Sequence, residues 1–179
     1  MITEFEIGIL LWVQAHLQCT LLTGIATVLS YIGEAGIVWI VITLFMLIRK
    51  DTRRVGVAMA IALLLDLLFC NVLIKPLVAR VRPYYQCTDL LPPVYLPTEY
   101  SFPSGHTASA FAAAGAMVFE KGRGRWAAIL FSVIMGLSRI YLTVHFPTDV
   151  ICAVPLGLFC AFLGHLAAKL LAKRLHFAE

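Results

Sequence analysis

The amino-acid sequence predicts an all-α membrane protein, a polytopic bundle of about six helices. Hydrophobic residues make up 61% of the 179-residue chain, whereas soluble domains carry about 45–50%. Charged residues make up only 13%, against about 25% in soluble domains. Several apolar segments also approach the length of about 20 residues that a helix needs to cross a bilayer. A soluble domain of this size could not bury so much apolar surface, so this class of protein is excluded.

Five segments meet or approach the length of a membrane span, namely residues 31–48, 55–74, 105–119, 126–144 and 150–172. The third segment is short and rich in alanine, and we infer its crossing because the spans on either side of it must be joined across the bilayer. The N-terminal stretch 5–30 is interrupted by Gln14 and His16, so it is either a sixth span or a helix in the membrane interface. The sequence therefore predicts five firm spans plus an N-terminal helix, in a single integral-membrane domain over residues 1–179.

The basic residues predict how the spans are oriented. Ten of the 14 Lys and Arg residues fall in segments that the spans place on one face of the membrane: Arg49, Lys50, Arg53, Arg54, Lys121, Arg123, Arg125, Lys169, Lys173 and Arg174. Cytoplasmic loops carry an excess of Lys and Arg, so we expect this face and the C-terminus in the cytoplasm. The loop 75–104 and the turn near His145 then face outward. We expect the inner membrane of a bacterium, with these segments in the periplasm.

Polar and charged residues gather at the outer ends of three spans, between residues 75 and 149. Because alternate loops share a side of the membrane, the topology brings these segments to one face. Lysine and arginine supply positive charge and, for arginine, planar bidentate donors that suit phosphate oxygens. Ser104 and Gly105 open a helix, where free backbone N–H groups and the helix dipole favour an anion. The whole set comprises Lys75, Arg82, Ser104, Gly105, His106, Arg139, His145 and Asp149.

Two histidines in this set, His106 and His145, fit a division of labour in phosphoryl transfer. One can attack phosphorus while the other protonates the leaving oxygen. Asp149 lies four residues after His145, so in a helical turn the two side chains share a face. An aspartate bonded to one ring nitrogen would fix the tautomer and leave the other nitrogen free to attack. The residues therefore predict phosphoryl transfer through a phosphohistidine.

Three motifs make this pattern specific: Lys75-x6-Arg82-Pro83, Pro103-Ser104-Gly105-His106 and Ser138-Arg139-x5-His145-x3-Asp149. Together they closely resemble the type-2 phosphatidic acid phosphatase superfamily, which includes lipid phosphatases, soluble class A acid phosphatases and vanadium haloperoxidases. The membrane setting resembles the lipid phosphatase branch, with its bacterial undecaprenyl pyrophosphate and phosphatidylglycerophosphate phosphatases. Three motifs in the right order, each at a helix end on one face, make the resemblance a strong one.

The resemblance implies a metal-independent phosphatase with a core of six helices and no cofactor. By position in the motifs, it implies that His145 is the nucleophile, Asp149 its orienting partner and His106 the general acid. The phosphate-binding residues that it implies are Lys75, Arg82, Ser104, Gly105 and Arg139. Many relatives have a glycine near Ala153, a departure that concerns helix packing and leaves the catalytic assignment intact.

Other polar residues have less specific roles. We expect Arg80 to be an interfacial charge outside the motif spacing. Asp66 lies inside an apolar span, about 13 Å from Lys75 along a helix, and serves either an interhelical hydrogen bond or a functional proton or charge role. The loop 84–100 is rich in tyrosine and proline, and we expect it to lie over the site and to help admit a lipid head group.

Several functions fit these observations. The first is a lipid phosphatase acting on a phosphomonoester or pyrophosphate, with undecaprenyl pyrophosphate as first choice and phosphatidylglycerophosphate or phosphatidic acid next. The second is a lipid phosphotransferase, because a phosphohistidine can be discharged by an acceptor other than water. The third is an anion channel or transporter, which would not need the two histidines and the aspartate. The expected partners are a lipid phosphate and the bilayer, with no nucleic acid, and the sequence leaves the oligomeric state open.

Overall fold

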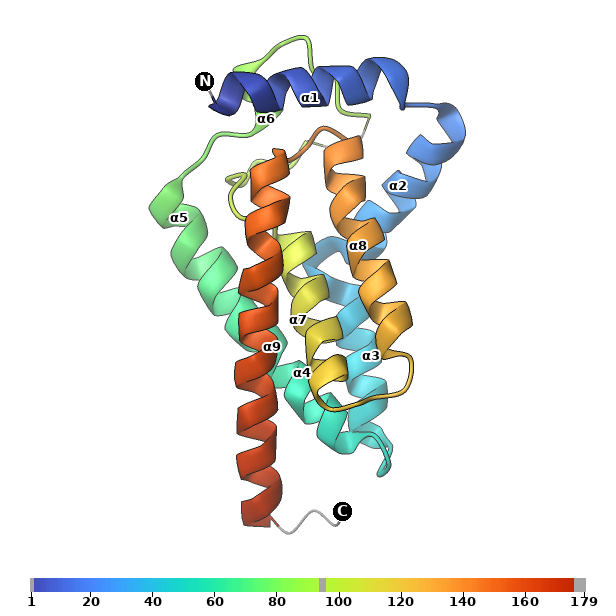
Figure 1. Ribbon diagram of the computed structural model, residues 1–179, viewed down its shortest axis with the longest axis vertical. Coiled ribbons are helices and arrows are strands. Elements are labelled where there is room, and N and C mark those ends of the chain that lie inside the picture. Colours follow the sequence, from blue (N-terminus) through green and yellow to red (C-terminus); the bar gives the residue numbers. More distant parts are fainter. Residues whose placement is uncertain (1, 94–95, 176–179) are drawn as a thin grey trace.

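The computed structural model describes residues 2–93 and 96–175, and this part of the chain is helical with no strand. The α-helices are α1 (Ile2–His16), α2 (Thr20–Gly33), α3 (Ile37–Ile48), α4 (Arg53–Asp66), α5 (Lys75–Val78), α6 (Pro83–Gln86), α7 (Gly105–Phe119), α8 (Arg125–Tyr141) and α9 (Pro147–Leu175). A 3-10 helix, Glu34–Gly36, joins α2 to α3, and a π-helix, Leu67–Ile74, joins α4 to α5. With these two joints, the described residues form six long helical units, as the sequence predicts (Figure 1).

The N-terminal stretch divides into two helices that run in different directions. α1 lies crosswise over one end of the bundle (Figure 1) and exposes Phe5 and Trp12. The turn after α1 is held on α8, because Gln18 Nε2 donates to the Tyr141 carbonyl at 2.8 Å and the Cys19 N–H donates to the Tyr141 hydroxyl at 3.0 Å. Residues 5–30, for which the sequence left open a sixth span or an interfacial helix, are therefore divided between two helices. The part before this turn lies across the bundle, and the part after it enters the bundle.

α2 and α3 together form the first span. The chain passes between them through Ala35 and Gly36, which adopt left-handed φ values of 50° and 70°. The regular helix is interrupted at this kink, and the apolar segment continues through it. The resulting apolar segment, Thr20–Ile48, has 29 residues. The span therefore begins at Thr20 and not at the predicted residue 31.

A π-helix carries the second span toward the end of the bundle that holds α1. The apolar segment Arg53–Gln86 has 34 residues and contains the predicted span 55–74. π-Helical turns inside α-helices are frequently found at functional sites, and this one ends at Ile74, directly before Lys75. Ala79 then adopts a left-handed φ of 49°. This residue ends α5 and turns the chain across the end of the bundle.

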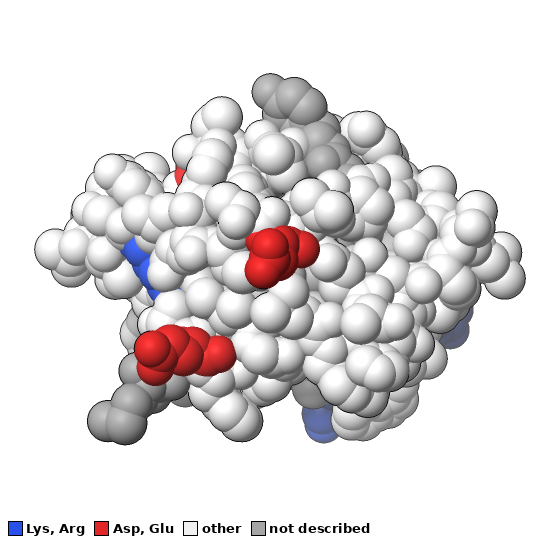
Figure 2. All heavy atoms as spheres, turned by 90° about the horizontal axis from the view of Figure 1, so that it is seen from above, with Lys and Arg blue, Asp and Glu red and all other residues white. Residues whose placement is uncertain are grey.

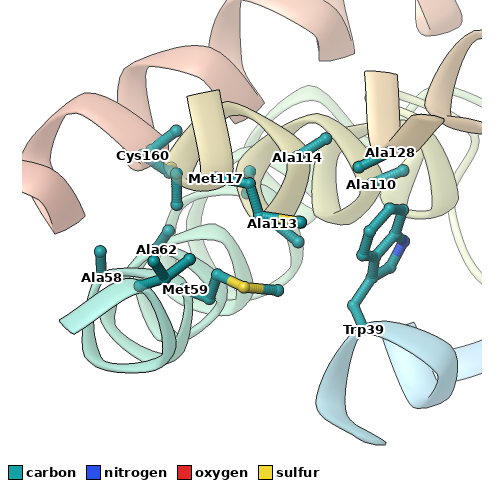
Figure 3. Close-up of a cluster of buried hydrophobic side chains, with 14 of the residues drawn as sticks. Trp39, Ala58, Met59, Ala62, Ala110, Ala113, Ala114, Met117, Ala128 and Cys160 are labelled. Atoms are coloured by element: carbon teal, nitrogen blue, oxygen red, sulfur yellow. The ribbon is translucent and has the colours of Figure 1, made fainter. Parts of the chain in front are cut away.

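α7 is the central helix, and its small residues let neighbouring helices approach closely. Its fully buried alanines are Ala108, Ala110, Ala112, Ala113, Ala114 and Ala116. A Cβ added at Gly157 of α9 would lie 2.4 Å from the Ala108 carbonyl oxygen, and one at Gly164 would lie 2.5 Å from the Ala58 carbonyl oxygen of α4. Small residues at such contacts are typical of helix packing in membranes. Figure 3 shows alanines of α7 among side chains from the neighbouring helices.

Among the described residues, three segments are long and apolar enough to cross a bilayer: Thr20–Ile48, Arg53–Gln86 and Pro147–Lys173. α7 and α8 have 15 and 17 residues, which is short for a span. They run alongside the long helices in the bundle (Figure 1). α7 is enclosed by other helices, so its alanines contact protein and not lipid. A helix without lipid contact does not need a strongly apolar composition.

The two ends of the bundle differ in charge. Seen from the end that carries α1, the surface is largely uncharged, with few basic groups and separate acidic groups (Figure 2). The predicted basic face lies at the opposite end, where α3 meets α4, α7 meets α8 and α9 finishes (Figure 1). Of the charged residues at this end, those of the three motifs, Lys75, Arg82, Arg139 and Asp149, are buried in its interior, whereas the acidic groups seen in Figure 2 lie on its surface.

Candidate active site

The three motifs meet in a cavity at the end of the bundle that carries α1. The cavity has a volume of about 1140 Å³. Its walls include Lys75, Arg82, Gly105, His106, Arg139 and His145. Ser104 and Asp149 are fully buried, and the Ser104 N–H donates to the Asp149 carbonyl at 3.1 Å. The structure therefore brings all the predicted site residues to one place.

The two cations of the first motif are both held by Glu99, which the motif pattern did not reveal. Glu99 belongs to the loop 84–100, called the outer loop here after its predicted orientation. Lys75 Nζ lies 2.7 Å from Glu99 Oε2, and Arg82 Nε donates to the Glu99 backbone oxygen at 2.7 Å. Arg82 Nη1 donates to the Val144 carbonyl at 3.0 Å and lies 3.3 Å from His145 Nε2. The hydrogen bond from Lys75 holds the pKa of Glu99 below its ordinary value. Glu99 thus competes with any incoming anion for Lys75.

The outer loop also covers one side of the cavity. Residues 97–99 line its wall, and the Tyr84 hydroxyl donates to the Pro97 carbonyl. This contact ties the loop to α6, close to Arg82. The loop is placed where we expect a lipid head group to pass.

α2 contributes Ser30, another residue that sequence reasoning missed. Its hydroxyl accepts a hydrogen bond from Arg139 Nη1 at 2.8 Å, and its carbonyl oxygen lies 3.1 Å from His106 Nε2. Ser138 accepts two further bonds from the same guanidinium, at 2.9 and 3.1 Å. Ser30 therefore positions both a cation and the second histidine. It lies 76 residues from His106 in the chain, and no motif spacing points to it.

The first turn of α7 faces the cations. Ser104 occupies the N-cap position and Gly105 begins the helix. A Cβ added at Gly105 would lie 3.6 Å from Lys75 Nζ and 3.3 Å from Asn71 Oδ1, so the helix backbone here directly faces the lysine. The first N–H groups of a helix have no intrahelical acceptor and favour an anion. The start of α7 and Lys75 thus lie side by side at the cavity, an arrangement whose chemistry suits an anion.

His145 lies in the turn between α8 and α9, between a cation and a carboxylate. Its Nδ1 lies 3.4 Å from Asp149 Oδ2, which also accepts bonds from the Phe146 N–H at 2.9 Å and from the Ser101 hydroxyl. Burial lowers the pKa of His145 to about 4, although the hydrogen bond with Asp149 opposes this shift. The ring is therefore neutral at pH 7. With Nδ1 facing the carboxylate and Nε2 facing Arg82, the lone pair is on Nε2, the nitrogen available for attack.

Arg80 belongs to the site, so the expectation that it is an interfacial charge was wrong. Its Nη1 lies 2.7 Å from Asp149 Oδ1 and its Nη2 lies 2.6 Å from Glu6 Oε2. The turn at Ala79 directs this part of the chain across the end of the bundle. Motif spacing could not reveal the role, because Arg80 contacts an aspartate 69 residues away and not the cavity.

Deeper in the cavity, Asp66 and Asn71 line the wall. Asp66 is 2% exposed, and its Oδ1 has no hydrogen-bond partner among the described residues. The interhelical hydrogen bond that was one of its two expected roles is therefore not formed in this part of the chain. Within residues 2–93 and 96–175, no group of three or more His, Cys, Asp or Glu side chains is placed to hold a metal ion.

The fold and this site define an integral-membrane phosphatase that acts on lipid phosphates. Residues 51–172 match the sequence profile of the PAP2 superfamily, and the chain belongs to that superfamily. The resemblance that the three motifs indicated is confirmed.

Individual relatives agree with this assignment. Undecaprenyl-diphosphatase of Sulfolobus acidocaldarius is 33% identical over 152 residues, which cover 82% of this chain and 71% of that protein. Decaprenylphosphoryl-5-phosphoribose phosphatase of Mycobacterium tuberculosis is 36% identical over 129 residues, which cover 72% of this chain and 71% of that protein. The crystal structure of a transmembrane PAP2-type phosphatidylglycerolphosphate phosphatase from Bacillus subtilis matches with a TM-score of 0.76 at 27% identity, over 94% of this chain and 86% of that one. This match confirms the predicted all-helical membrane fold.

Proposed function

We propose that the protein removes phosphate from a membrane lipid through a phosphohistidine on His145, without a metal ion, at the outer membrane–water interface. The observation that carries this proposal is the shape of the cavity. It joins the phosphate-binding cluster to an apolar groove lined by Ile40, Leu44, Leu47, Leu63, Leu64 and Leu67. A lipid tail can lie between α3 and α4 while its phosphate reaches the cations.

The cations and the start of α7 hold the phosphate. Lys75, Arg82 and Arg139 all border the cavity, and they enclose the position that Nε2 of His145 faces. Charge on the phosphoryl oxygens is stabilised best by donors already fixed in place. Arg82 and Arg139 meet this condition, because backbone and serine oxygens hold their guanidinium groups. The phosphate-binding role of Gly105 follows from the free N–H groups of the first turn. The Ser104 N–H is already bonded to the Asp149 carbonyl, so its proposed contribution is its hydroxyl, which lies 3.0 Å from the Thr107 hydroxyl.

The reaction has two displacement steps at phosphorus. In the first, Nε2 of His145 forms a bond to phosphorus, the bond from phosphorus to the leaving oxygen breaks, and His106 donates a proton to that oxygen. In the second, His106 takes a proton from water, the water oxygen bonds to phosphorus, and the bond to Nε2 breaks to release inorganic phosphate. Asp149 accepts the hydrogen bond from Nδ1 and stabilises the positive charge that the ring gains when it is phosphorylated.

Undecaprenyl pyrophosphate is our first choice of substrate, followed by phosphatidylglycerophosphate and phosphatidic acid. Similarity to the undecaprenyl-diphosphatase of Sulfolobus acidocaldarius supports the first, and similarity to the phosphatidylglycerolphosphate phosphatase of Bacillus subtilis supports the second. The basic residues at the end opposite the cavity support an outward-facing site with the C-terminus in the cytoplasm. A bacterial inner membrane would place the site in the periplasm.

A substrate panel tests the proposal. Purified protein in detergent is given isoprenyl pyrophosphates, phosphatidylglycerophosphate, phosphatidic acid and a soluble phosphate ester, and released phosphate is measured. We expect the lipid substrates to be preferred, His145→Ala to lower kcat by about 10³-fold or more, and EDTA to have no effect. The matched control is His16→Ala, because His16 is an exposed histidine outside the cavity.

Three results would contradict parts of this proposal. Wild-type activity in His145→Ala would exclude it as the nucleophile. Activity that is lost in EDTA and restored by a divalent metal would exclude the metal-free reaction. Thin-layer analysis that shows the phosphoryl group on an added alcohol or lipid, in place of inorganic phosphate, would identify the alternative function, a lipid phosphotransferase.

A further inference from the structure

A buried network of charges joins α1 to the aspartate of the site. Arg80 lies between two carboxylates, with Nη1 at 2.7 Å from Asp149 Oδ1 and Nη2 at 2.6 Å from Glu6 Oε2. Asp149 is 0% exposed and Glu6 is 2% exposed. Neither Glu6 nor Arg80 is among the residues that line the cavity. Any effect of these two residues on the reaction must therefore act through their neighbours.

The second carboxylate oxygen of Glu6 holds the start of α9. Oε1 accepts bonds from the Thr148 N–H at 2.8 Å and from the Thr148 hydroxyl at 2.7 Å. Thr148 is the second residue of α9, so its N–H has no acceptor within the helix. A carboxylate at a helix N-terminus is also favoured by the helix dipole. Glu6 thus fixes the turn that presents Asp149.

Arg80 holds the other side of the same turn. Its Nη1 donates to the Thr148 hydroxyl at 2.7 Å in addition to its bond with Asp149. Its guanidinium lies 3.8 Å from the centre of the Phe146 ring, and Phe146 directly follows His145. Arg80 therefore contacts Phe146, Thr148 and Asp149, all within the turn that runs from the proposed nucleophile His145 to its partner.

The charges in this network balance in a specific way. Asp149 uses Oδ2 for His145 and Oδ1 for Arg80. If Arg80 were paired with Asp149 alone, it would neutralise more of the negative charge of Asp149. The attraction between Asp149 and the His145 ring would then be weaker. Glu6 shares the positive charge of Arg80, so Asp149 keeps more of its own charge for the histidine. Buried charges are stable only when they are paired in this manner.

From this geometry we propose that Glu6 and Arg80 are positioning residues for the His145–Asp149 pair, and that α1 is thereby part of the catalytic unit. The inference rests on the proposed function, in which His145 is the nucleophile. Glu6 sets the place of Asp149 by capping α9, and the Glu6–Arg80 pair sets how strongly Asp149 polarises His145.

Glu6→Gln is the central test, because glutamine has the size of glutamate and keeps one acceptor oxygen for Thr148, but removes the charge and the second acceptor that face Arg80. The loss of the triad aspartate in serine proteases costs about 10⁴-fold in kcat, so a residue acting through the aspartate should cost less. We expect kcat to fall about 10- to 100-fold and KM to change less than about threefold. Asp89→Asn is the matched control, since it removes an exposed carboxylate from the outer loop. It should behave as the wild type.

The pH profile separates this role from a merely structural one. His145 is faced by Asp149 on α9, Arg82 before α6, Arg139 on α8, and by Glu99 and His106 across the cavity. None of these groups changes in Glu6→Gln. Loss of the Glu6 charge leaves Arg80 paired with Asp149 alone, so the imidazolium is less stable and the acid limb of kcat/KM should move to lower pH.

Two further variants test the route of the effect. In an Asp149→Asn background, Glu6→Gln should cause little additional loss of kcat, because the residue through which it acts is already changed. Arg80→Ala should be inactive or nearly so, and guanidinium ion at millimolar concentration should restore part of kcat where an equal concentration of sodium chloride does not. Thermal unfolding in detergent checks that each variant is folded.

The outcomes distinguish this inference from the proposed function. If His145→Ala is inactive while folded Glu6→Gln has a kcat within threefold of wild type, or an acid limb that has not moved, the positioning role is wrong and the proposed function stands. If His145→Ala keeps wild-type activity, the proposed mechanism itself is wrong. Additive losses in the Asp149→Asn background would also overturn the route through Asp149.

Discussion

The ion pair between Lys75 and Glu99 leads to a prediction with a calculable size. A lipid phosphate must displace the Glu99 carboxylate from Lys75 Nζ, from which it lies 2.7 Å. The Glu99 side chain is 70% exposed and that of Lys75 is 9% exposed, so water screens the pair and it is worth about 0.2–1 kcal/mol. Because 1.4 kcal/mol corresponds to a factor of ten, Glu99→Gln should lower KM by about 1.5- to 5-fold.

The remaining kinetic parameters of Glu99→Gln follow from the same contacts. kcat should not change, because the contact to Arg82 comes from the Glu99 backbone, which the substitution keeps. Since the hydrogen bond from Lys75 holds the pKa of Glu99 below its ordinary value, the wild-type carboxylate stays charged at neutral pH. The difference from the variant should therefore be constant across about pH 6–8. Added salt should reduce it, because a partly exposed ion pair is screened.

The assay for this variant is phosphate release from lipid phosphate in mixed micelles, over a range of substrate concentrations. Asp89→Asn removes another exposed carboxylate of the outer loop and should leave KM unchanged. A rise in KM for Glu99→Gln would refute the reasoning, because it would mean that the carboxylate contributes to substrate binding. A fall of more than tenfold would also refute the assumed screening.

Other predictions concern packing, pH and the guanidinium of the first motif. Gly157→Ala places a Cβ 2.4 Å from the Ala108 carbonyl oxygen and should cost about 1–3 kcal/mol of stability, measured as a lower Tm in detergent. The control is Gly24→Ala, whose added Cβ would meet nothing within 4 Å. An equal change of Tm in both variants would contradict the packing argument. Because burial lowers the pKa of His145 to about 4 and the neutral ring is the proposed nucleophile, kcat/KM should rise as pH increases through about 4; a midpoint near the ordinary histidine value would contradict this. Arg82→Lys keeps the charge but loses the planar set of donors, so kcat/KM should fall about tenfold or more, and an unchanged value would show that charge alone suffices.

The predicted spans and the observed helices agree best after residue 50 and least at the N-terminus. Hydropathy reports how apolar a segment is, and the segments 55–74 and 150–172 are enclosed by helical spans in the structure. It could not divide residues 5–30, because the break after α1 depends on hydrogen bonds to Tyr141, more than 100 residues away. The short helix α7 was predicted from the alternation of crossings, and its burial inside the bundle explains its weak hydropathy.

In the candidate site, too, some residues could be predicted from the sequence and others could not. The motif residues could be predicted because they are chemically distinctive, closely spaced, and placed by topology on one face. Ser30, Glu99 and Ser101 carry no such signal, because serine and glutamate are common in loops and helix ends. Their roles come from contacts with residues far away in the chain, such as the bond of Ser30 to Arg139 over 109 positions.

Arg80 shows why spacing alone could mislead. It lies two residues before Arg82, so the motif excludes it as a phosphate ligand, and the cavity confirms that it does not line the site. Its partners are instead Glu6 and Asp149. Because the partners of Arg80 are distant from it in the sequence, no local sequence pattern around Arg80 reveals its role.

The sequence by itself determined that this protein is a helical membrane protein with a phosphate-handling cluster at one face. Composition, span length and motif spacing are local properties, and the bilayer allows few topologies for them. Only the tertiary structure decided that α1 lies across that face, that Glu6 reaches Arg80, and that a cavity joins the cluster to an apolar groove. The physical reason is that buried charges must find partners wherever the fold brings them, and those partners are set by packing and not by distance along the chain.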